Sequence, residues 1–597
     1  MTNSNVIRHI LCVMWSNSDQ TTDRELAAMC SGLAGARTGG RFCRHWCETL
    51  LVVLLLAISM FLNVSGLSWG LPSKQRSQFY PPEAKWYEAP NPTRLYNTAP
   101  YDSYNCDEGR ILDGLSNMNP SKLDFNPHAF VYPSLSMYLT GATMKAADLL
   151  GFYHLQSSKD FYIKHPEKMA QLFITGRLVA VAMSVVGVLL LYLTVRGLFG
   201  VPTAILSSAV LATMPLWVRD SHFLLVNVPA AVWMIASAYC ASLAMRNGSS
   251  RLLVISALLA GFAASTKYPA GAVLVLSFFV LLRQKRRLGR LTAWLLVVCA
   301  VGFLLGTPYS ILAPREFLQD MHVASCSSGL PSPSIILTQL FVAQGTILAL
   351  VTLCGLAIIA ARLGAPKYQF LALWFLLGMA PRIISGMPVI RYILFGLPPL
   401  AIAAGIALNE ILVLFSRQNR ERPRAIGVLL CLLLIAPSAA YSLNIIAVMR
   451  KNDVRNIAAD WLHNNIPAGC AIGISGDILS DMPPINANRY ILVNLEQVKT
   501  QINLTPVIVL TSETSRKLLP DMSSYSCQTF SQRPSPLWTW PVSTWPRDWA
   551  FTFLDIHVYR KELRSGTPGK AAESAPSPPL EVNLPDDSTR RTARPDS

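Results

Sequence analysis

Charged residues are scarce in this sequence. Of its 597 residues only 14% are charged, whereas 52% are hydrophobic and the mean hydropathy is +0.36. A soluble protein usually carries about 25% charged residues. The deficit is concentrated between residues 48 and 448. This excludes an ordinary soluble domain there and predicts that this part of the chain lies in a membrane.

Motifs that hold nucleotides or metal ions are also absent. The sequence contains no P-loop, no dinucleotide-binding fingerprint, no G-x-S-x-G and no H-E-x-x-H pattern. Its 12 cysteines form no CxxC pair and no Cys/His spacing that would suit zinc. We therefore predict no metal ion and no cofactor. Cys470 and Cys527 could form a disulfide if their domain lies outside the cytoplasm.

The net charge of +17 could indicate a nucleic-acid partner. However, the arginines and lysines cluster in short segments between apolar runs. There they set the orientation of membrane spans instead of forming a groove for phosphates. We therefore predict membrane lipids, and no nucleic acid, as partners.

Apolar runs long enough, or nearly long enough, to cross a membrane occur about eleven times, since a span takes about 20 residues. They lie at 49–69, 170–195, 201–219, 225–245, 252–266, 269–282, 291–312, 335–361, 368–381, 391–415 and 425–448. With the N-terminus in the cytoplasm, the short loops on the cytoplasmic side carry most of the basic residues, as the positive-inside rule requires. This predicts an odd number of spans and puts the residues after 448 outside the cytoplasm.

The spans divide the chain into four parts. We predict a cytoplasmic N-terminal segment, a transmembrane domain, an extracytoplasmic α/β domain and a disordered tail, at 1–47, 48–448, 449–563 and 564–597. The α/β prediction rests on a helical pattern at 456–462, followed by short apolar runs typical of strands at 470–475, 489–495 and 506–512. The predicted fold class is a mostly α, polytopic membrane protein with about eleven transmembrane helices and a small C-terminal α/β domain.

The first outer loop, residues 70–169, is too long for a simple connector. Its apolar stretch 129–153 is interrupted by Lys145 and Asp148, so we predict a helix that lies along the membrane surface. The alternative is a twelfth span, which would invert every later loop and remove the charge bias.

An acidic pair, Asp107 and Glu108, lies in this loop. A carboxylate at the outer membrane face could act as a base toward a hydroxyl group or stabilise positive charge on a sugar. The alternative is a solvated acidic turn, which residue type alone favours.

Further polar candidates lie near the same membrane face. His128 and Tyr132 could contact a sugar, or they could belong to an interfacial aromatic belt. Arg219, His222 or both could bind a phosphate. Asn227 lies just inside the following span, where an amide usually has a partner, and a hydrogen bond between helices is an equally good explanation.

Three basic residues could bind a lipid phosphate. Lys267 would act as a point charge, with a snorkelling lysine as the alternative. Arg382 and Arg391 flank a short outer loop and suit a phosphate or diphosphate headgroup. Their alternative role, as interfacial anchors, is less expected because this side normally lacks cations.

The order of these features along the chain carries more information than any one of them. In sequence they are Asp107-Glu108, Asn126-Pro127-His128, Tyr132-Pro133, Arg177, Leu198-Phe199-Gly200, Ser221-His222, Pro229, Thr266-Lys267-Tyr268, Thr307-Pro308-Tyr309, Arg391-Tyr392, Trp461 and Ile466-Pro467-Ala468-Gly469. This series resembles the multi-span glycosyltransferases that use polyprenyl-phosphate sugars, the protein-mannosyltransferase-like and aminoarabinose-transferase-like group. The resemblance covers about residues 49–560.

The resemblance implies a bundle of about eleven to thirteen spans with surface-lying helices in the first outer loop. It implies transfer of a sugar from a polyprenyl-phosphate carrier to a protein, lipid or glycan acceptor outside the cytoplasm. Asp107 would be the catalytic carboxylate, supported by Glu108, and Lys267 and Arg391 would be candidates for binding the donor phosphate. The missing nucleotide motif fits a donor delivered within the bilayer. In a bacterium the membrane would be the inner one.

One residue departs from the family pattern. Many relatives have an aspartate where this chain has Asn227, and an amide can act neither as a base nor as a charged metal ligand. Three explanations stay open: Asp220 substitutes from across the loop, this acid is dispensable, or the activity is altered.

Two other functions stay open as well. A secondary transporter or lipid flippase often has internal repeats and ionisable residues in mid-membrane. The sequence shows no repeat of the span pattern, and its acidic pair lies in a loop. An inactive glycosyltransferase relative acting as an assembly partner would fit Asn227.

Overall fold

The computed structural model describes most of the chain between Arg37 and Lys561. The described residues are 37–79, 102–284, 288–325, 330–387, 389–416, 421–474, 482–486, 488–495, 505–511, 525–533, 546–550 and 552–561. The tail predicted at 564–597 and most of the segment predicted at 1–47 lie outside these ranges.

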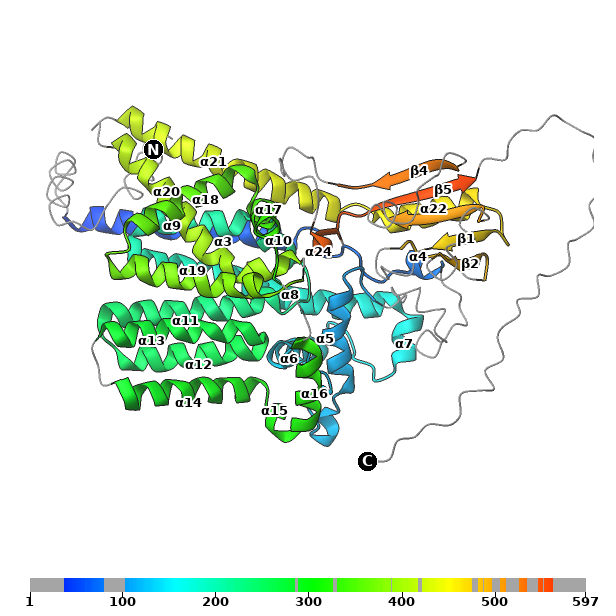
Figure 1. Cartoon of the computed structure of the whole chain (residues 1–597), viewed down its shortest axis with the longest axis horizontal. Coiled ribbons are helices and arrows are strands. Elements are labelled where there is room, and N and C mark those ends of the chain that lie inside the picture. Colours follow the sequence, from blue (N-terminus) through cyan, green and yellow to red (C-terminus); the bar gives the residue numbers. More distant parts are fainter. Residues whose placement is uncertain are drawn as a thin grey trace, which may run out of the picture.

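A bundle of long helices forms the larger part of the structure (Figure 1). Each predicted apolar run coincides with one helix or with two consecutive helices. These are α3 (Arg37–Val64), α8 (Pro166–Phe199), α9 (Val201–Thr213) with α10 (Pro215–Ser221), α11 (Asn227–Asn247), α12 (Ser250–Thr266), η3 (Tyr268–Val273) with α13 (Leu274–Arg283), α14 (Leu288–Gly306), α17 (Pro333–Gln344) with α18 (Thr346–Ala361), α19 (Pro366–Ile384), η4 (Ile390–Gly396) with α20 (Leu397–Ser416), and α21 (Glu421–Met449). Among the described residues, 6 helices are long and apolar enough to cross a membrane, or up to 8 if each bent pair is one span. The predicted polytopic, mostly helical membrane fold is confirmed.

Two bends in the bundle have local causes. α9 and α10 meet at 59°, where Met214 precedes Pro215. Proline lacks an amide hydrogen and disfavours helical backbone in the residue before it, and Met214 is extended, with φ −64° and ψ 125°. α17 and α18 meet at 113° around Gly345, whose φ of +81° is readily adopted only by glycine. The helix after the first bend, α10, carries Arg219 and Asp220.

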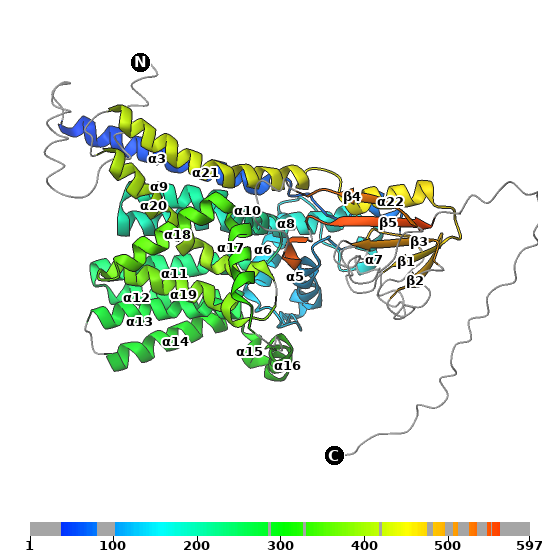
Figure 2. The ribbon, with the colours of Figure 1, turned by 45° about the horizontal axis from the view of Figure 1, so that its top comes forward.

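The first outer loop forms a layer of short helices across that end (Figures 1 and 2). Its helices are α4 (Lys74–Ser77), α5 (Cys106–Asn117), η2 (Pro120–Lys122), α6 (Leu135–Leu149) and α7 (Lys159–Lys164), and α15 (Tyr309–Leu312) and α16 (Pro314–Ser325) join them from a later connection. α6 has only 15 residues, too few to cross a membrane, and it packs against α5 and α8. A helix within 129–153 is confirmed and is too short for the alternative of a twelfth span, whereas its position along the membrane surface stays a prediction.

The C-terminal domain lies at the same end of the bundle (Figure 1). It contains α22 (Val454–Asn465), β1 (Ala471–Ile474), β2 (Ile491–Asn494), β3 (Val507–Thr511), β4 (Tyr525–Ser531), α24 (Arg547–Ala550) and β5 (Asp555–Lys561). The sheet order is β2-β1-β3-β5-β4; β1 is parallel to β2 and β3, and β5 is antiparallel to β3 and β4. The small α/β domain is confirmed, with its helix and first three strands where the sequence predicts them.

Two strands and one cysteine pairing differ from the sequence predictions. β4 and β5 mix buried and exposed residues, so neither forms an apolar run that the sequence would reveal. Cys470 and Cys527 are both free thiols. The disulfide considered for them is wrong, because Cys470 precedes β1, Cys527 lies in β4, and β3 and β5 separate these two strands.

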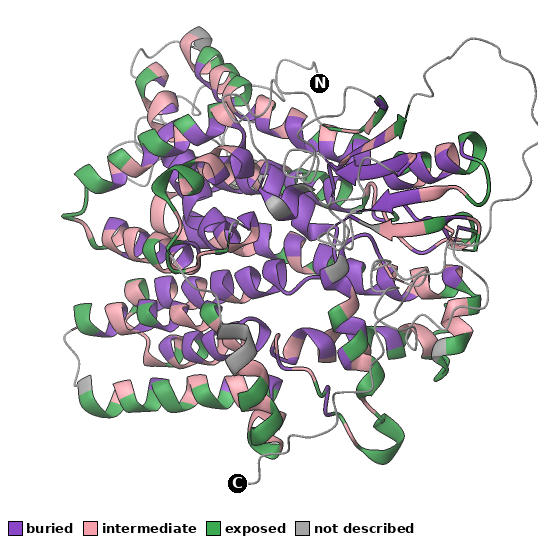
Figure 3. Cartoon of the chain, turned by 45° about the vertical axis from the view of Figure 1, so that its right-hand side comes forward, coloured by how far each residue is buried: buried purple, intermediate pink, exposed green. Residues whose placement is uncertain are grey.

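The C-terminal domain packs directly against the first outer loop. The ring of Tyr104 lies between two guanidinium groups, 4.1 Å from that of Arg76 and 3.9 Å from that of Arg455. Its hydroxyl donates a hydrogen bond of 2.5 Å to Asn456 of α22. Cation–π contacts of this kind are strongest when desolvated, and the Tyr104 side chain is fully buried. Figure 3 shows buried residues continuing from the bundle into this junction.

Candidate functional site

The acidic pair begins helix α5 instead of forming a solvated turn. Asn105 is the N-cap, and its side chain accepts a hydrogen bond of 3.4 Å from the Asp107 amide. Carboxylates in a first helical turn are stabilised by the helix dipole, which explains why two acids can follow the cap directly. Both are buried, with 7% of Asp107 and none of Glu108 exposed. Neighbouring residues on a helix point about 100° apart, so the two carboxylates face different surroundings.

Glu108 is held in a fully buried ion pair with Arg177 of α8. The Arg177 guanidinium donates to both Glu108 oxygens, at 2.8 and 2.6 Å. The Ser103 hydroxyl and the Leu224 amide donate to the same carboxylate at 2.5 and 2.7 Å. Arg177 also donates to the carbonyl of Trp69 at 2.8 Å. These contacts occupy the carboxylate of Glu108 and fasten the start of α5 to the bundle.

Asp107 faces the start of η4. One of its oxygens is in close contact with a guanidinium nitrogen of Arg391, and the other lies 3.5 Å from Nε of Arg110. Tyr132, from the same loop, lies within electrostatic reach of Asp107 and Arg391. Burial raises the pKa of Tyr132 to about 12, and the charge of Asp107 adds to this rise. Its phenol therefore stays a neutral hydrogen-bond donor at physiological pH.

A chain of polar contacts lies near Asp107, formed by the end of α10, the start of α11 and the junction of α12 with η3. The Lys267 ammonium donates to the side-chain oxygen of Asn227 at 2.6 Å, and the Asn227 amide nitrogen lies 3.5 Å from a carboxylate oxygen of Asp220. The other Asp220 oxygen accepts from Arg219 at 2.7 Å. Lys267 also lies 5.0 Å from the ring of Tyr392. Lys267 is within electrostatic reach of Asp107 and Asp220, so these groups form one buried charged cluster.

Arg382, at the end of α19, has unfilled donors near this cluster. Its side chain is fully buried, and one terminal nitrogen donates to the carbonyls of Ser385 and Met387 at 2.9 and 2.8 Å. Among the described residues, its Nε and second terminal nitrogen have no hydrogen-bond partner. A buried guanidinium with two unfilled donors is costly unless an acceptor reaches it. The arrangement therefore suits an anion.

Three residues that the sequence analysis considered for substrate binding have polar groups that contact other parts of the protein. Both ring nitrogens of His222 face backbone carbonyls, those of Val218 at 2.7 Å and Ser65 at 2.9 Å. His128 is 2.9 Å from the carboxylate of Glu316 in α16 and adopts a φ of +47°. Arg219 donates to Asp220, to Thr552 and to the carbonyl of residue 548. Binding of substrate by His128 or His222 stays a prediction.

The sequence analysis missed Asp548, which α24 brings into the cluster. Its two carboxylate oxygens accept hydrogen bonds from the backbone amides of Ile390 and Arg391, at 2.8 and 3.1 Å. No local pattern connects residues 157 positions apart. A tryptophan-rich stretch ends at Trp549, and tryptophan is enriched at membrane interfaces. That was the one signal that this segment returns to the bundle.

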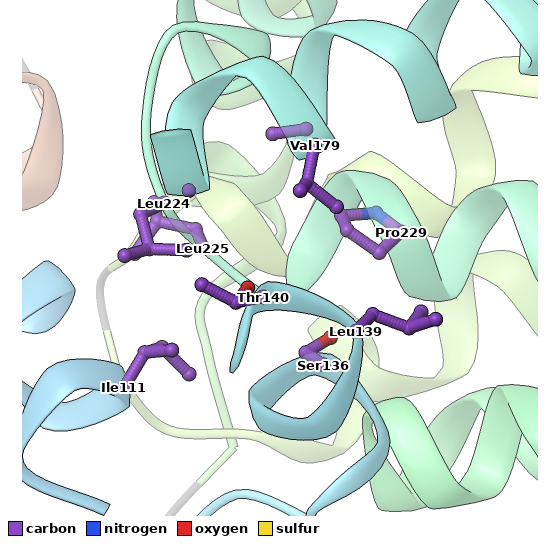
Figure 4. Close-up of a pocket in the computed structure, with 10 residues that line it drawn as sticks. Ile111, Ser136, Leu139, Thr140, Val179, Leu224, Leu225 and Pro229 are labelled. Carbon is purple, nitrogen blue, oxygen red and sulfur yellow. The ribbon is translucent and has the colours of Figure 1, made fainter. Parts of the chain in front are cut away.

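A pocket lies between α5, α6, α8 and the start of α11 (Figure 4). It is lined by Ile111, Ser136, Leu139, Thr140, Gly176, Val179, Ala180, Leu224, Leu225 and Pro229. Ile111 is four residues after Asp107 on α5, so both lie on the same helix face. The walls are apolar except for two hydroxyls, and such a lining accommodates hydrocarbon better than sugar.

Residues 171–311 match the family model of dolichyl-phosphate-mannose-protein mannosyltransferases. This part of the chain is similar to that family. The predicted resemblance to polyprenyl-phosphate-sugar-dependent membrane glycosyltransferases is confirmed, as is the predicted class of enzyme. The matched region contains Arg177, Asp220, Asn227 and Lys267, whereas Asp107 lies before it. Comparison with curated proteins gives no match.

The solved structures that match this chain are distant in sequence. The oligosaccharyltransferase of Archaeoglobus fulgidus in the apo form is 11% identical over 78% of this chain and 70% of its own, with a TM-score of 0.43. ArnT from Cupriavidus metallidurans bound to undecaprenyl phosphate is 14% identical over 88% of this chain and 98% of its own, with a TM-score of 0.40. The Pmt1-Pmt2 complex of S. cerevisiae bound to the sugar donor is 16% identical over 48% of this chain and 36% of its own, with a TM-score of 0.26.

Proposed function

We propose that this membrane glycosyltransferase moves a sugar from a polyprenyl phosphate to a hydroxyl-bearing acceptor, with Asp107 as the catalytic carboxylate. The acceptor oxygen forms a bond to the anomeric carbon, and the bond from that carbon to the phosphate oxygen breaks. The acceptor proton passes to Asp107, and polyprenyl phosphate leaves. The observation that carries this proposal is the position of Asp107, buried at the start of α5 and surrounded by basic side chains.

Asp107 has the surroundings that a base in this reaction needs. Its contacts are to the guanidinium groups of Arg110 and Arg391, and it lies where the loop helices meet the bundle. A positioned carboxylate typically contributes about 100- to 10,000-fold through proton transfer. In contrast, all the donors around Glu108 come from the protein itself. Glu108 therefore supports Asp107 by fixing the start of α5.

Excess positive charge at the cluster supports binding of the donor phosphate. Basic side chains outnumber the carboxylates: Arg110, Arg219, Lys267, Arg382 and Arg391 lie around Asp107, Asp220 and Asp548. An anion would balance this charge, and Arg382 offers two unfilled donors. We assign the phosphate to Lys267, Arg382 and Arg391. Tyr132 lies near Asp107 and Arg391 and could donate a hydrogen bond to the sugar.

Asp220 takes over the charge that many relatives place at position 227. The Asn227 amide is 3.5 Å from the Asp220 carboxylate and accepts from Lys267, so it connects the two charges without carrying one. Two facing carboxylates at that distance would repel each other, and one would take up a proton or a cation. An asparagine beside Asp220 avoids this conflict, which favours an active enzyme over an inactive relative.

Moving the negative charge from position 220 to position 227 tests the role of Asp220. D220N is expected to lower sugar transfer at least about tenfold, because one buried electrostatic contact to the reacting groups is lost. The double variant D220N/N227D returns a carboxylate to the cluster and is expected to recover part of that loss. Initial transfer rates of the wild type, both single variants and the double variant check this. A fully active D220N would show that the acid is dispensable.

The function is tested with purified full-length protein and a panel of polyprenyl-phosphate sugars. Release of polyprenyl phosphate and appearance of sugar on protein, lipid or glycan acceptors are measured together. Transfer from at least one lipid-linked sugar, and none from nucleotide sugars, is expected. Transport of lipid-linked sugar across vesicles without any transfer would support the transporter alternative instead.

The site and the C-terminal domain lie at one end of the bundle, and we propose that this end faces the outside of a bacterial inner membrane. Cys527 is an exposed free thiol of the C-terminal domain and serves as a reporter. A membrane-impermeant maleimide added to intact spheroplasts is expected to label Cys527 of the wild type. The C527S variant, which lacks this thiol, shows which part of the labelling belongs to Cys527. Labelling of Cys527 only after lysis would place the domain in the cytoplasm and contradict the proposed orientation.

A further inference from the structure

The segment around α24 leaves the sheet of the C-terminal domain and enters the helical bundle (Figure 1). Trp549 is fully buried and belongs to the same hydrophobic core as the membrane helices, together with Phe553. Its ring centroid is 6.2 Å from that of Tyr441 in α21. A buried tryptophan contributes a large apolar area. This segment therefore anchors the soluble domain in the bundle.

Asp548, next to this anchor, fixes the backbone that carries Arg391. Its carboxylate accepts hydrogen bonds from two consecutive amides at the start of η4, at 2.8 Å from Ile390 and 3.1 Å from Arg391. A charged acceptor on free amides at a helix start is strong and directional. The side chain of Arg391 leaves from this fixed backbone and contacts Asp107. A single residue, Arg391, thus connects this aspartate of the C-terminal domain to Asp107.

A second contact ties the same segment to Asp220. Arg219 donates from Nε to the Thr552 hydroxyl at 3.3 Å and from a terminal nitrogen to the Asp548 carbonyl. Its other terminal nitrogen donates to Asp220 at 2.7 Å. Arg219 therefore holds Asp220 on one side and the α24 segment on the other. Two charged groups of the site, Arg391 and Asp220, thus depend on Asp548 and Thr552 for their positions.

We propose that Asp548 is a positioning residue for sugar transfer: it holds Arg391 against Asp107 and makes the reaction depend on docking of the C-terminal domain. This inference rests on the proposed function. A shift of reacting groups by about 1 Å can cost about 100-fold in rate. The domain thus acts as part of the active site, through the contacts of Asp548 with the start of η4.

The test is a double-mutant cycle between Asp548 and Arg391 in the full chain. In D548N the side-chain NH₂ faces one of the two backbone amides, so that two donors oppose each other. We expect D548N to lower the transfer rate about 10- to 100-fold. R391K keeps the positive charge but loses the planar fork. If Asp548 acts through Arg391, D548N slows R391K by no more than about twofold, because coupled sites are not additive.

D555N is the matched control, since Asp555 is a carboxylate of the same domain whose partners Ser531 and Arg533 also lie in that domain. It is expected to transfer sugar within about twofold of the wild type. A D548N variant as fast as the wild type, or rate losses of D548N and R391K that multiply in the double variant, would overturn the inference, because a general loss of stability multiplies. A wild type that transfers no sugar would overturn the proposed function itself.

Discussion

The D107N variant is expected to transfer sugar about 100- to 10,000-fold more slowly than the wild type, the range typical of a lost general base. The amide has nearly the size of the carboxylate and can still accept a hydrogen bond from Arg391, so the fold is retained. It cannot take up the acceptor proton or stabilise positive charge on the sugar. The measurement is the initial rate of polyprenyl phosphate release at saturating donor.

Measuring how tightly D107N binds the donor distinguishes a catalytic role of Asp107 from a structural role. Asp107 repels the phosphate that its basic neighbours attract, so D107N is expected to bind polyprenyl-phosphate sugar as well as the wild type or more tightly. D113N is the control, because Asp113 lies on the same helix and is exposed. It should keep transfer within about twofold. A D107N enzyme with an unchanged rate would remove Asp107 from the mechanism and require another base.

The membrane fold was predictable because each span must satisfy its own backbone hydrogen bonds in lipid. The sequence signal of a span is therefore local, and every predicted apolar run corresponds to one helix or to two consecutive helices in the structure. The start of helix α5 could also have been predicted from the sequence. Asn105 followed three residues later by Glu108 is the pattern of a capping box, which indicates a helix start at the acidic pair instead of a turn.

The separation of the two acids could not be predicted, since it depends on contacts between distant segments. Glu108 meets Arg177 at 69 positions along the chain, and Asp107 meets Arg391 at 284 positions. Likewise, Asp548 is an ordinary surface residue by sequence, and only the return of α24 into the bundle buries it. The sequence predicts which residues lie near the outer face, whereas tertiary packing decides which of them meet.

The R177A variant is expected to lose about 3–5 kcal/mol of stability, because it leaves Glu108 as a buried charge without its partner. Both side chains of this pair are fully buried, so water cannot replace the guanidinium. R196A is the matched control on the same helix. The Arg196–Glu48 pair is partly exposed, with 43% of the arginine side chain accessible, and exposed pairs contribute about 1 kcal/mol or less. Thermal unfolding in one detergent compares the two variants.

The double variant E108Q/R177M separates the cost of a lone charge from the value of the pair. It removes both charges, and replacing a buried pair by uncharged groups often costs far less than removing one partner. We expect it to unfold at a higher temperature than R177A. Its transfer rate should nevertheless stay low, because Glu108 and Arg177 also fix the start of α5 and with it Asp107. Equal unfolding temperatures for R177A and the wild type would show that the pair does not hold this loop to the bundle.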